Sequence, residues 1–284
     1  MRNLKAYTED AFLFHKNVVK RKQNPKADLG YKARLDSYNS KVENQFKLYD
    51  NGFNDKILEN LIALSLTAQE KSDILALYSY KAKAIQNLKI KLTTTETNRI
   101  ISTCQNCTIG EVSSMDHILP KETFAEFVVH PKNLFPSCSK CNSFKVNSWL
   151  EDGRRVFLNL FIDELPPEQY LFVNAVVTTD NIQTFFQVEN RNGIPQELFR
   201  LIQSHYGKLY LCQRFSESAS EVITALDNSI VPYVGKLPPH EIISAVKEKI
   251  LRDKSVFGPN YWKSVLELSL IDNKDYLDRL FLRS

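Results

Sequence analysis

Four of the five cysteines fall into two closely spaced pairs, Cys104/Cys107 and Cys138/Cys141, with 30 residues between the pairs. Four thiolates in two such pairs suit a tetrahedral structural zinc ion and leave no coordination position open for catalysis. We therefore predict one structural zinc ion bound by all four side chains. Cys212 stands alone, and we expect it to pack as a small hydrophobic residue.

The segment MDHILPKETFAEFVVHPKNLFPSCSKCNSFK resembles the HNH endonuclease family, which has a ββα-metal fold. The family pattern places a first His, often preceded by Asp, near the end of one strand. An Asn follows in the second strand, and an Asn or His lies on the succeeding helix. Asp116 and His117 match the first element, Asn133 the middle one and Asn142 the last. The resemblance covers only the segment around the two cysteine pairs.

The spacing of this segment predicts a hairpin followed by a helix. We expect a first strand at Ser113–Ile118, a long loop at Leu119–Lys132, a second strand at Asn133–Phe135 and a helix beginning near Cys141. An antiparallel hairpin returns to its starting point, so the cysteine pair before it meets the pair after it. A module this small buries little apolar surface, and the zinc ion supplies the missing stability.

The expected helix presents Asn142 and Lys145 three residues apart, on a face that can lie across the end of the first strand. Asp116 and Asn142 then offer oxygen ligands to one divalent cation, and oxygen ligands favour Mg²⁺ or Mn²⁺. His117, not bound to the metal, would deprotonate the attacking water, since we expect its pKa near neutral pH. The cation would polarise the scissile phosphate and stabilise the leaving 3′ oxygen.

Other positions of the segment have more than one interpretation. The resemblance implies that Asn133 holds the loop and so orients His117. Lys145 either contacts a phosphate oxygen or is an ordinary exposed helix lysine, and we interpret His130 as a loop histidine. In a purely structural zinc ribbon, the Asp116–His117 pair would form a turn, Asn133 would end a strand and Asn142 would begin a helix.

The flanking sequence predicts the elements around this module. Residues 1–100 have helical patterns, above all Lys56–Leu92, where Thr67 and Glu70 form a capping-box pattern between two expected helices. Residues 151–284 predict a β-hairpin from Tyr170–Val177 and Thr184–Val188, joined by a turn at residues 179–181, and helices from Pro195 onward. The prediction is an α+β chain, mainly helical, in three parts: 1–100, 101–150 and 151–284.

The distribution of charge suggests where nucleic acid would bind. Residues 1–103 hold 18 Lys and Arg against 11 Asp and Glu, and the remainder holds 19 against 22. The basic part either faces a polyanion or is a solvated charged surface. Candidate phosphate contacts are Lys20, Arg21, Lys22, Arg154 and Arg155. We expect a cytoplasmic protein without a membrane partner, because the sequence has no secretory signal and no long apolar run.

The sequence therefore favours a metal-dependent HNH endonuclease that hydrolyses phosphodiester bonds, with double-stranded DNA as the expected substrate. An inactive zinc-dependent nucleic-acid-binding or adaptor protein and an RNA or tRNA nuclease are the alternatives. The chain also resembles HNH effectors of bacterial antiphage systems such as the Septu type, some of which work with a partner ATPase. A homing or restriction enzyme is the competing context.

Overall fold

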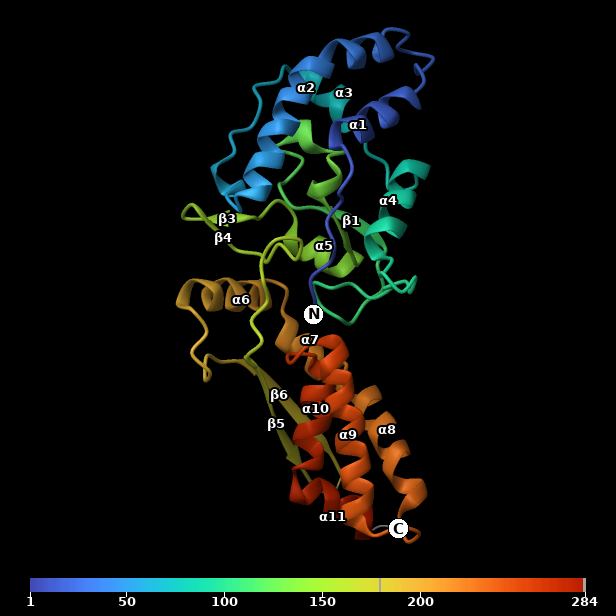
Figure 1. Cartoon of the computed structure of the whole chain (residues 1–284), viewed down its shortest axis with the longest axis vertical. Helices are drawn as coiled ribbons and strands as arrows, with labels where there is room; N and C mark the ends of the chain where they lie inside the picture. The colour runs from blue at the N-terminus through green and yellow to red at the C-terminus, as the bar shows by residue number, and fades with distance from the viewer. Residues whose placement is uncertain (179, 283–284) are drawn as a thin grey trace. The chain divides into compact units, whose positions relative to one another are not determined.

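The computed structural model describes residues 1–178 and 180–282, and the chain divides into two compact units (Figure 1). Asn3–Asn106 and Gly110–Glu164 form the N-terminal unit, which contains the helical region and most of the central module expected from the sequence. Leu165–Ser284 form the C-terminal unit, together with two short pieces from earlier in the chain, Met1–Arg2 and Cys107–Ile109. Among the described residues, no helix is both long and apolar enough to cross a membrane.

The N-terminal unit is built on helices that enclose an aromatic core. Its helical elements are α1 (Ala11–Lys20), α2 (Tyr31–Asn54), η1 (Leu58–Asn60), α3 (Ala68–Leu75), α4 (Lys83–Thr93), η2 (Ala125–Phe127) and η3 (Pro131–Asn133). Phe46 and Tyr49 of α2 pack against Phe127 of η2, and all three rings are almost fully buried. The helices are thereby fixed to the long loop of the central hairpin. The expected capping box at the start of α3 is confirmed, because Thr67 and Glu70 each bond the other's backbone amide.

The expected helix through Leu58–Leu66 is wrong. Helix α2 ends at Asn54, and only the single 3₁₀ turn η1 follows before α3. The amide of Leu64 donates to the Glu126 carboxylate at 2.7 Å instead of to a carbonyl of its own segment. Ile62, one of the apolar residues at helical spacing in this segment, is 85% exposed. Packing against η2 therefore overrides the helical spacing of the apolar residues.

The centre of this unit is an antiparallel hairpin followed by a short helix. Strand β1 (Ser114–His117) pairs with β2 (Leu134–Ser137), so that His117 lies opposite Leu134, and α5 (Ser139–Lys145) follows at once. The helix begins two residues before the expected Cys141. A second small hairpin, β3 (Leu150–Glu151) with β4 (Arg154–Arg155), ends the module.

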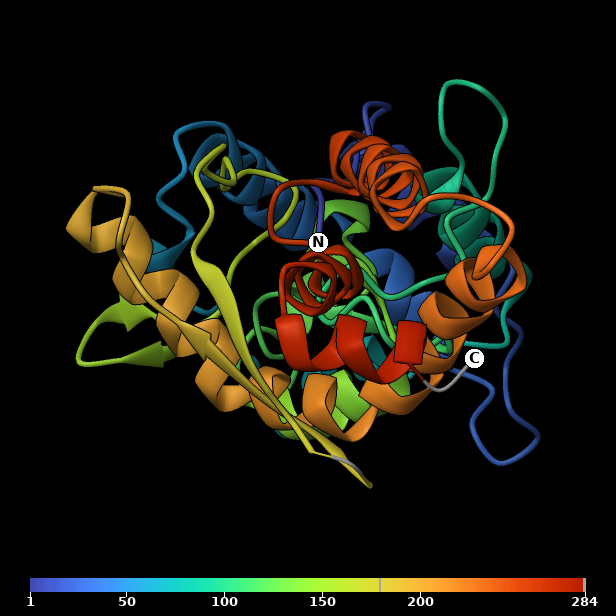
Figure 2. The same ribbon diagram turned by 90° about the horizontal axis from the view of Figure 1, so that it is seen from below.

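The C-terminal unit packs helices against a two-stranded ribbon, as the sequence predicts. Strands β5 (Leu171–Val177) and β6 (Ile182–Val188) pair along their whole length, with α10 against β5 and α7 against β6 (Figure 2). Thr179, in the predicted turn, lies outside the described residues. The helical elements are α6 (Gln196–Lys208), α7 (Leu211–Glu217), α8 (Ala219–Ile230), η4 (Val231–Tyr233), α9 (Pro239–Phe257), α10 (Trp262–Ile271) and α11 (Lys274–Leu282). The chain is thus α+β, with small antiparallel strand pairs among helices.

Candidate metal centre and adjoining site

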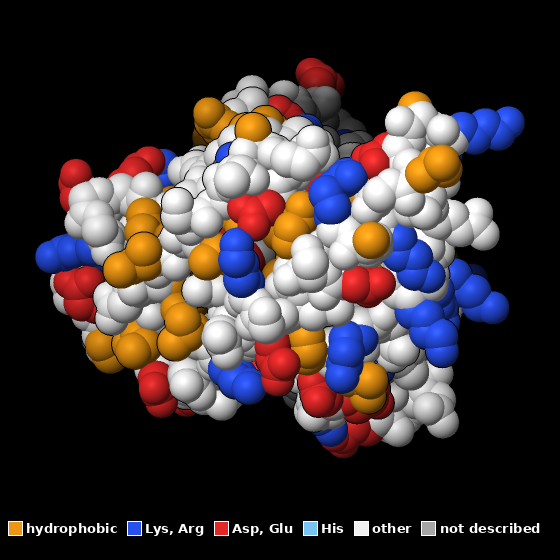
Figure 3. All heavy atoms as spheres, turned by 90° about the horizontal axis from the view of Figure 1, so that it is seen from above, with side chains coloured by type: hydrophobic (Ala, Val, Ile, Leu, Met, Phe, Trp, Pro, Cys, Tyr) orange, Lys and Arg blue, Asp and Glu red, His pale blue; other side chains and the backbone are white. Residues whose placement is uncertain are grey.

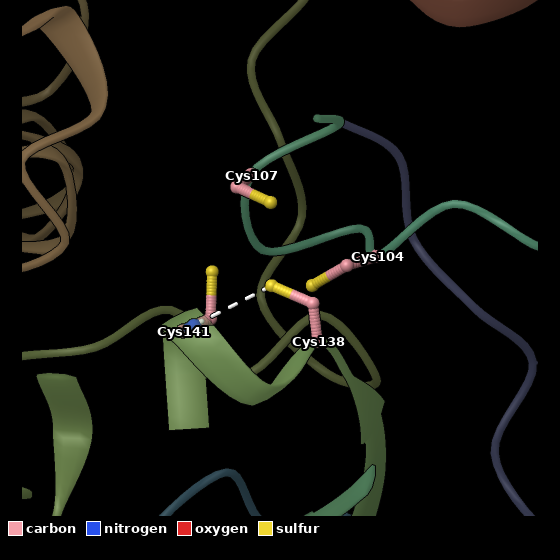
Figure 4. Close-up of side chains that lie close together, drawn as sticks. All are labelled: Cys104, Cys107, Cys138 and Cys141. Atoms are coloured by element: carbon pink, nitrogen blue, oxygen red, sulfur yellow. Dashed lines mark hydrogen bonds between the residues drawn. The ribbon is translucent and has the colours of Figure 1, made fainter. Parts of the chain in front are cut away.

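The two cysteine pairs meet as the sequence predicts (Figure 4). The sulfurs of Cys104, Cys107, Cys138 and Cys141 all lie within 4.8 Å of one another, and each side chain is at most 4% exposed. Four Zn–S bonds of about 2.3 Å in a tetrahedron would place the sulfurs about 3.8 Å apart. The cluster is therefore compatible with one tetrahedral zinc ion.

Local backbone geometry brings the four sulfurs together. A tight loop, closed by the Cys104 amide donating to the Gly110 carbonyl at 2.8 Å, presents the first pair. Cys138 is the residue before α5, and its Sγ accepts a hydrogen bond from the Cys141 amide at 3.4 Å (Figure 4). A Cβ at Gly110 would lie 3.1 Å from the Cβ of Cys138, so a larger residue here would press on this cysteine.

At the end of β1, a lysine ammonium binds two oxygens. Lys145 of α5 donates to Oδ2 of Asp116 at 3.0 Å and to the carbonyl of His117. Lys145 and Asp116 are 7% and 6% exposed, so water screens this pair weakly. Burial raises the pKa of Asp116, while the nearby Lys145 ammonium acts in the opposite direction. Lys145 is therefore not the exposed helix lysine that was one of its two interpretations.

The ring of His117 is held from two sides. Its Nε2 lies 2.9 Å from the carbonyl oxygen of Val128, and Tyr78 packs edge-on against it with ring centroids 4.8 Å apart. A carbonyl only accepts, so Nε2 carries the proton of the neutral ring and Nδ1 carries the lone pair. Among the described residues, the Val128 carbonyl is the hydrogen-bond partner of the ring, and it contacts Nε2 and not Nδ1.

The expected pKa near neutral pH for His117 is wrong. Burial of the ring, together with the smaller effect of the positive charges of Lys121 and Lys145, lowers the pKa of His117 to about 3. The hydrogen bond to Val128 opposes this shift without cancelling it. His117 is therefore uncharged at neutral pH, the form that can accept a proton, but a pKa this low makes it a weaker base than an ordinary histidine.

Asn133 ties both ends of the loop between the strands. Its Oδ1 accepts from the Leu119 amide at 2.7 Å and from the Tyr49 hydroxyl at 3.3 Å. Its Nδ2 donates to the carbonyls of Leu119 and Phe127 at 3.2 and 3.1 Å. Since Phe127 directly precedes Val128, these bonds also hold the carbonyl that orients His117.

Replacing Asn133 by alanine is expected to lower the free energy of unfolding of the N-terminal unit by about 3–5 kcal/mol, because several hydrogen bonds are lost and buried groups are left unpaired. Chemical denaturation would measure this loss. Asn87→Ala is a matched control, since Asn87 is exposed on α4 and should change stability by less than about 0.5 kcal/mol. Equal stabilities for the two variants would contradict the role of Asn133.

Asn142 is half-buried on α5, one turn before Lys145. Its side-chain amide makes no hydrogen bond within residues 1–178 and 180–282. Because Lys145 reaches Asp116 from the same face of the helix, this face of α5 is directed toward the end of β1. The Asn142 amide oxygen is available to a ligand on that face.

The structure does not bring the expected phosphate contacts together with this site. Lys20 and Arg21 are exposed at the end of α1, and the ammonium of Lys22 donates to the Ala76 carbonyl at 2.6 Å. Figure 3 shows Lys and Arg side chains gathered toward the right edge of one face and mixed with Asp and Glu elsewhere.

Arg154 and Arg155 differ in their surroundings. Arg154 is exposed on β4, whereas the Arg155 guanidinium forms two hydrogen bonds with the Asp163 carboxylate, at 2.8 and 2.9 Å. The expectation that Arg155 contacts phosphate is therefore corrected to a structural ion pair, which burial and hydrogen bonding make difficult to break.

Sequence reasoning missed two groups of the site. Val128 contributes only a backbone carbonyl, which leaves no signal in residue type. Tyr78 belongs to an apolar helical pattern, and its contact with His117 depends on the path of the chain between α3 and α4. His130, which we interpreted as a loop histidine, directly precedes η3 and is fully buried against Phe46 and Tyr49.

No family model matches the chain, and no solved structure matches it. Protein ea31 of Escherichia phage lambda is 31% identical over 183 residues, which is 59% of this chain and 60% of that protein. The chain thus spans less than two thirds of this relative's length, and the relative's name specifies no activity.

Proposed function

We propose that this chain is a metal-dependent endonuclease of the HNH type that hydrolyses phosphodiester bonds in double-stranded DNA. One observation carries the proposal: at the end of β1, an uncharged His117 ring is fixed through Nε2 by the Val128 carbonyl, and the neighbouring residue Asp116 carries a carboxylate that binds a positive charge. The hairpin-then-helix order of β1, β2 and α5 supports it. Without such a base, the four-cysteine cluster would suit a structural module equally well.

Two metal ions belong to this proposal, and we assign protein donor atoms to each. The four thiolates suit a structural Zn²⁺. At the second position, Asp116 and the His117 carbonyl supply oxygens that bind a cation, here the ammonium of Lys145, and Asn142 adds an unpaired amide. Oxygen donors favour Mg²⁺ or Mn²⁺. Such a cation, when bound, polarises the scissile phosphate and stabilises the leaving 3′ oxygen.

The chain's own residues supply the proton chemistry and the positioning. His117 accepts a proton from the attacking water on Nδ1, because Nε2 is held by Val128. The edge contact with Tyr78 limits rotation of the ring. Asn133 holds the loop that carries Val128, so the His117 ring is already oriented before the substrate binds.

A cleavage assay tests this function directly. Purified protein with its zinc retained would be incubated with plasmid DNA, linear double-stranded DNA, single-stranded DNA and RNA, in metal-free buffer and with Mg²⁺ or Mn²⁺. We expect cleavage of double-stranded DNA only when the divalent cation is added. Cleavage of RNA alone would reassign the substrate, and inert protein on every substrate would favour the adaptor function.

Asn142→Ala is expected to lower the cleavage rate at limiting Mg²⁺ about tenfold or more, with zinc content and unfolding unchanged, because one of few protein ligands to a weakly bound cation is lost. A Mg²⁺ titration of the cleavage rate would measure this effect. The neighbouring exposed Ser143→Ala serves as the control. Full activity of Asn142→Ala at all Mg²⁺ concentrations would remove Asn142 from the metal site.

The cellular role is part of the same proposal and rests on resemblance alone. Antiphage effectors of the Septu type suggest a partner ATPase, an antiviral role and a cytoplasmic location. Such an ATPase would be added to the cleavage assay. Cleavage only in its presence would indicate a nuclease that the partner controls, and no cleavage in its presence would indicate an inert adaptor.

A further inference from the structure

The buried ammonium of Lys145 lies where the sequence leads us to expect a metal ion. It contacts Oδ2 of Asp116 at 3.0 Å and the carbonyl of His117, and all three residues are at most 8% exposed. Among the described residues, Asp116 has no other ion-pair partner within 4.0 Å. The carboxylate is therefore neutralised by a side chain of the protein itself.

The Lys145 ammonium would repel a second positive charge placed beside the Asp116 carboxylate. The Asp116–Lys145 pair is nearly removed from water, so charges close to it interact more strongly than at a surface. The side chain of Lys121 adds another positive charge near His117. A divalent cation that approaches Asp116 thus meets repulsion until the Lys145 ammonium moves away.

The lysine side chain can make that movement without rearrangement of the fold. Lys145 is the last residue of α5, and its flexible four-carbon stem lets the ammonium leave Asp116 while the helix stays in place. A cation bound at Asp116 would itself bind a phosphate of the substrate. That phosphate would then lie close to the displaced ammonium and could pair with it. The Lys145 ammonium would thus pair with Asp116 before the cation binds and with phosphate afterwards.

We propose that Lys145 is an intrinsic competitor for the catalytic cation: its ammonium occupies the cation position at Asp116 and must be displaced before Mg²⁺ or Mn²⁺ binds. The proposal rests on the endonuclease function and adds a regulation of its metal site. The nuclease is held in a metal-poor state by its own side chain, and it binds the divalent cation most readily when phosphate can accept the displaced ammonium.

Direct Mn²⁺ binding to the full zinc-loaded chain tests the competition without an activity assay. Free Mn²⁺ would be followed by electron paramagnetic resonance in wild type, Lys145→Met, Lys145→Arg and the control Lys140→Met, which removes an exposed lysine of the same helix. We expect Lys145→Met to bind Mn²⁺ about tenfold more tightly or better, because the competing charge is removed. Lys145→Arg, which keeps the charge, and Lys140→Met should not gain affinity.

The outcomes separate this proposal from the endonuclease function. Equal Mn²⁺ affinity in wild type and Lys145→Met would overturn the competition while leaving the cation site in place. If neither protein binds Mn²⁺, the cation site itself is refuted and the competition with it. Asp116→Asn, which lacks the carboxylate, should bind no Mn²⁺, and binding that persists there would place the ion elsewhere and also overturn the proposal.

A second measurement uses only the wild-type protein and does not depend on the folding of a variant. Acetylation of lysines followed by peptide mass spectrometry would compare Lys145 in magnesium-free buffer and in saturating Mg²⁺. We expect Lys145 to be protected without Mg²⁺ and labelled severalfold faster with it, while labelling of Lys140 stays constant. Equal labelling of Lys145 in both conditions would overturn the proposal.

Discussion

Cys138→Ser is expected to release the bound metal and to unfold the hairpin with α5. Cys138 supplies one of four clustered sulfurs and also accepts the hydrogen bond from the Cys141 amide that begins the helix. Structural zinc sites in small peptides contribute about 10–16 kcal/mol. A typical domain is stable by about 5–15 kcal/mol. Loss of the ion therefore threatens the whole N-terminal unit. Elemental analysis and denaturant unfolding would show a fall from about one zinc ion per chain to none, with the unfolding transition shifted or lost.

The fifth cysteine provides a matched control for this experiment. Cys212 is half-buried in the C-terminal unit, outside the cluster. Cys212→Ser should retain about one zinc ion per chain and change stability only slightly. A Cys138→Ser protein with wild-type stability and no zinc would show that the cluster is not structural.

The cluster could be predicted from the sequence because its signal is local. Each cysteine pair is set by a tight loop or a helix start, and an antiparallel hairpin must bring its two ends together whatever surrounds it. The capping box of Thr67 and Glu70 was predictable for the same reason. Such patterns depend on a few neighbouring residues and not on the rest of the fold.

What could not be predicted depends on partners distant in sequence. The Glu126 carboxylate accepts a hydrogen bond from the Leu64 amide, which therefore does not bond within a helix. The Asp163 carboxylate accepts hydrogen bonds from the Arg155 guanidinium. The pKa of His117 depends on burial beneath loops that residue type does not describe. In each case the outcome depends on tertiary packing, which residue type and local spacing do not specify.

His117→Ala is expected to reduce cleavage of double-stranded DNA about 10²–10⁴-fold, the usual contribution of a general base. The substitution removes Nδ1, the lone pair that would accept the proton of water. It leaves the zinc cluster and the exposed basic side chains unchanged. Zinc content and DNA binding should therefore stay close to wild type, because they act in the ground state, whereas the base acts in the transition state. Single-turnover cleavage rates at saturating Mg²⁺ would measure the loss.

Two controls keep this test specific to the base. His240→Ala removes an exposed histidine at the start of α9 and should cleave at the wild-type rate. Tyr78→Phe keeps the ring beside His117 while losing the hydroxyl that donates to the Met115 carbonyl, so its loss should be much smaller than that of His117→Ala. If His117→Ala retains zinc and cleaves at the wild-type rate, His117 is not the base. If both proteins are inert with and without an ATPase partner, the adaptor function is preferred. A wild-type protein that cleaves only with its partner, and loses that activity in His117→Ala, would keep the base in this chain and place the control of cleavage outside it.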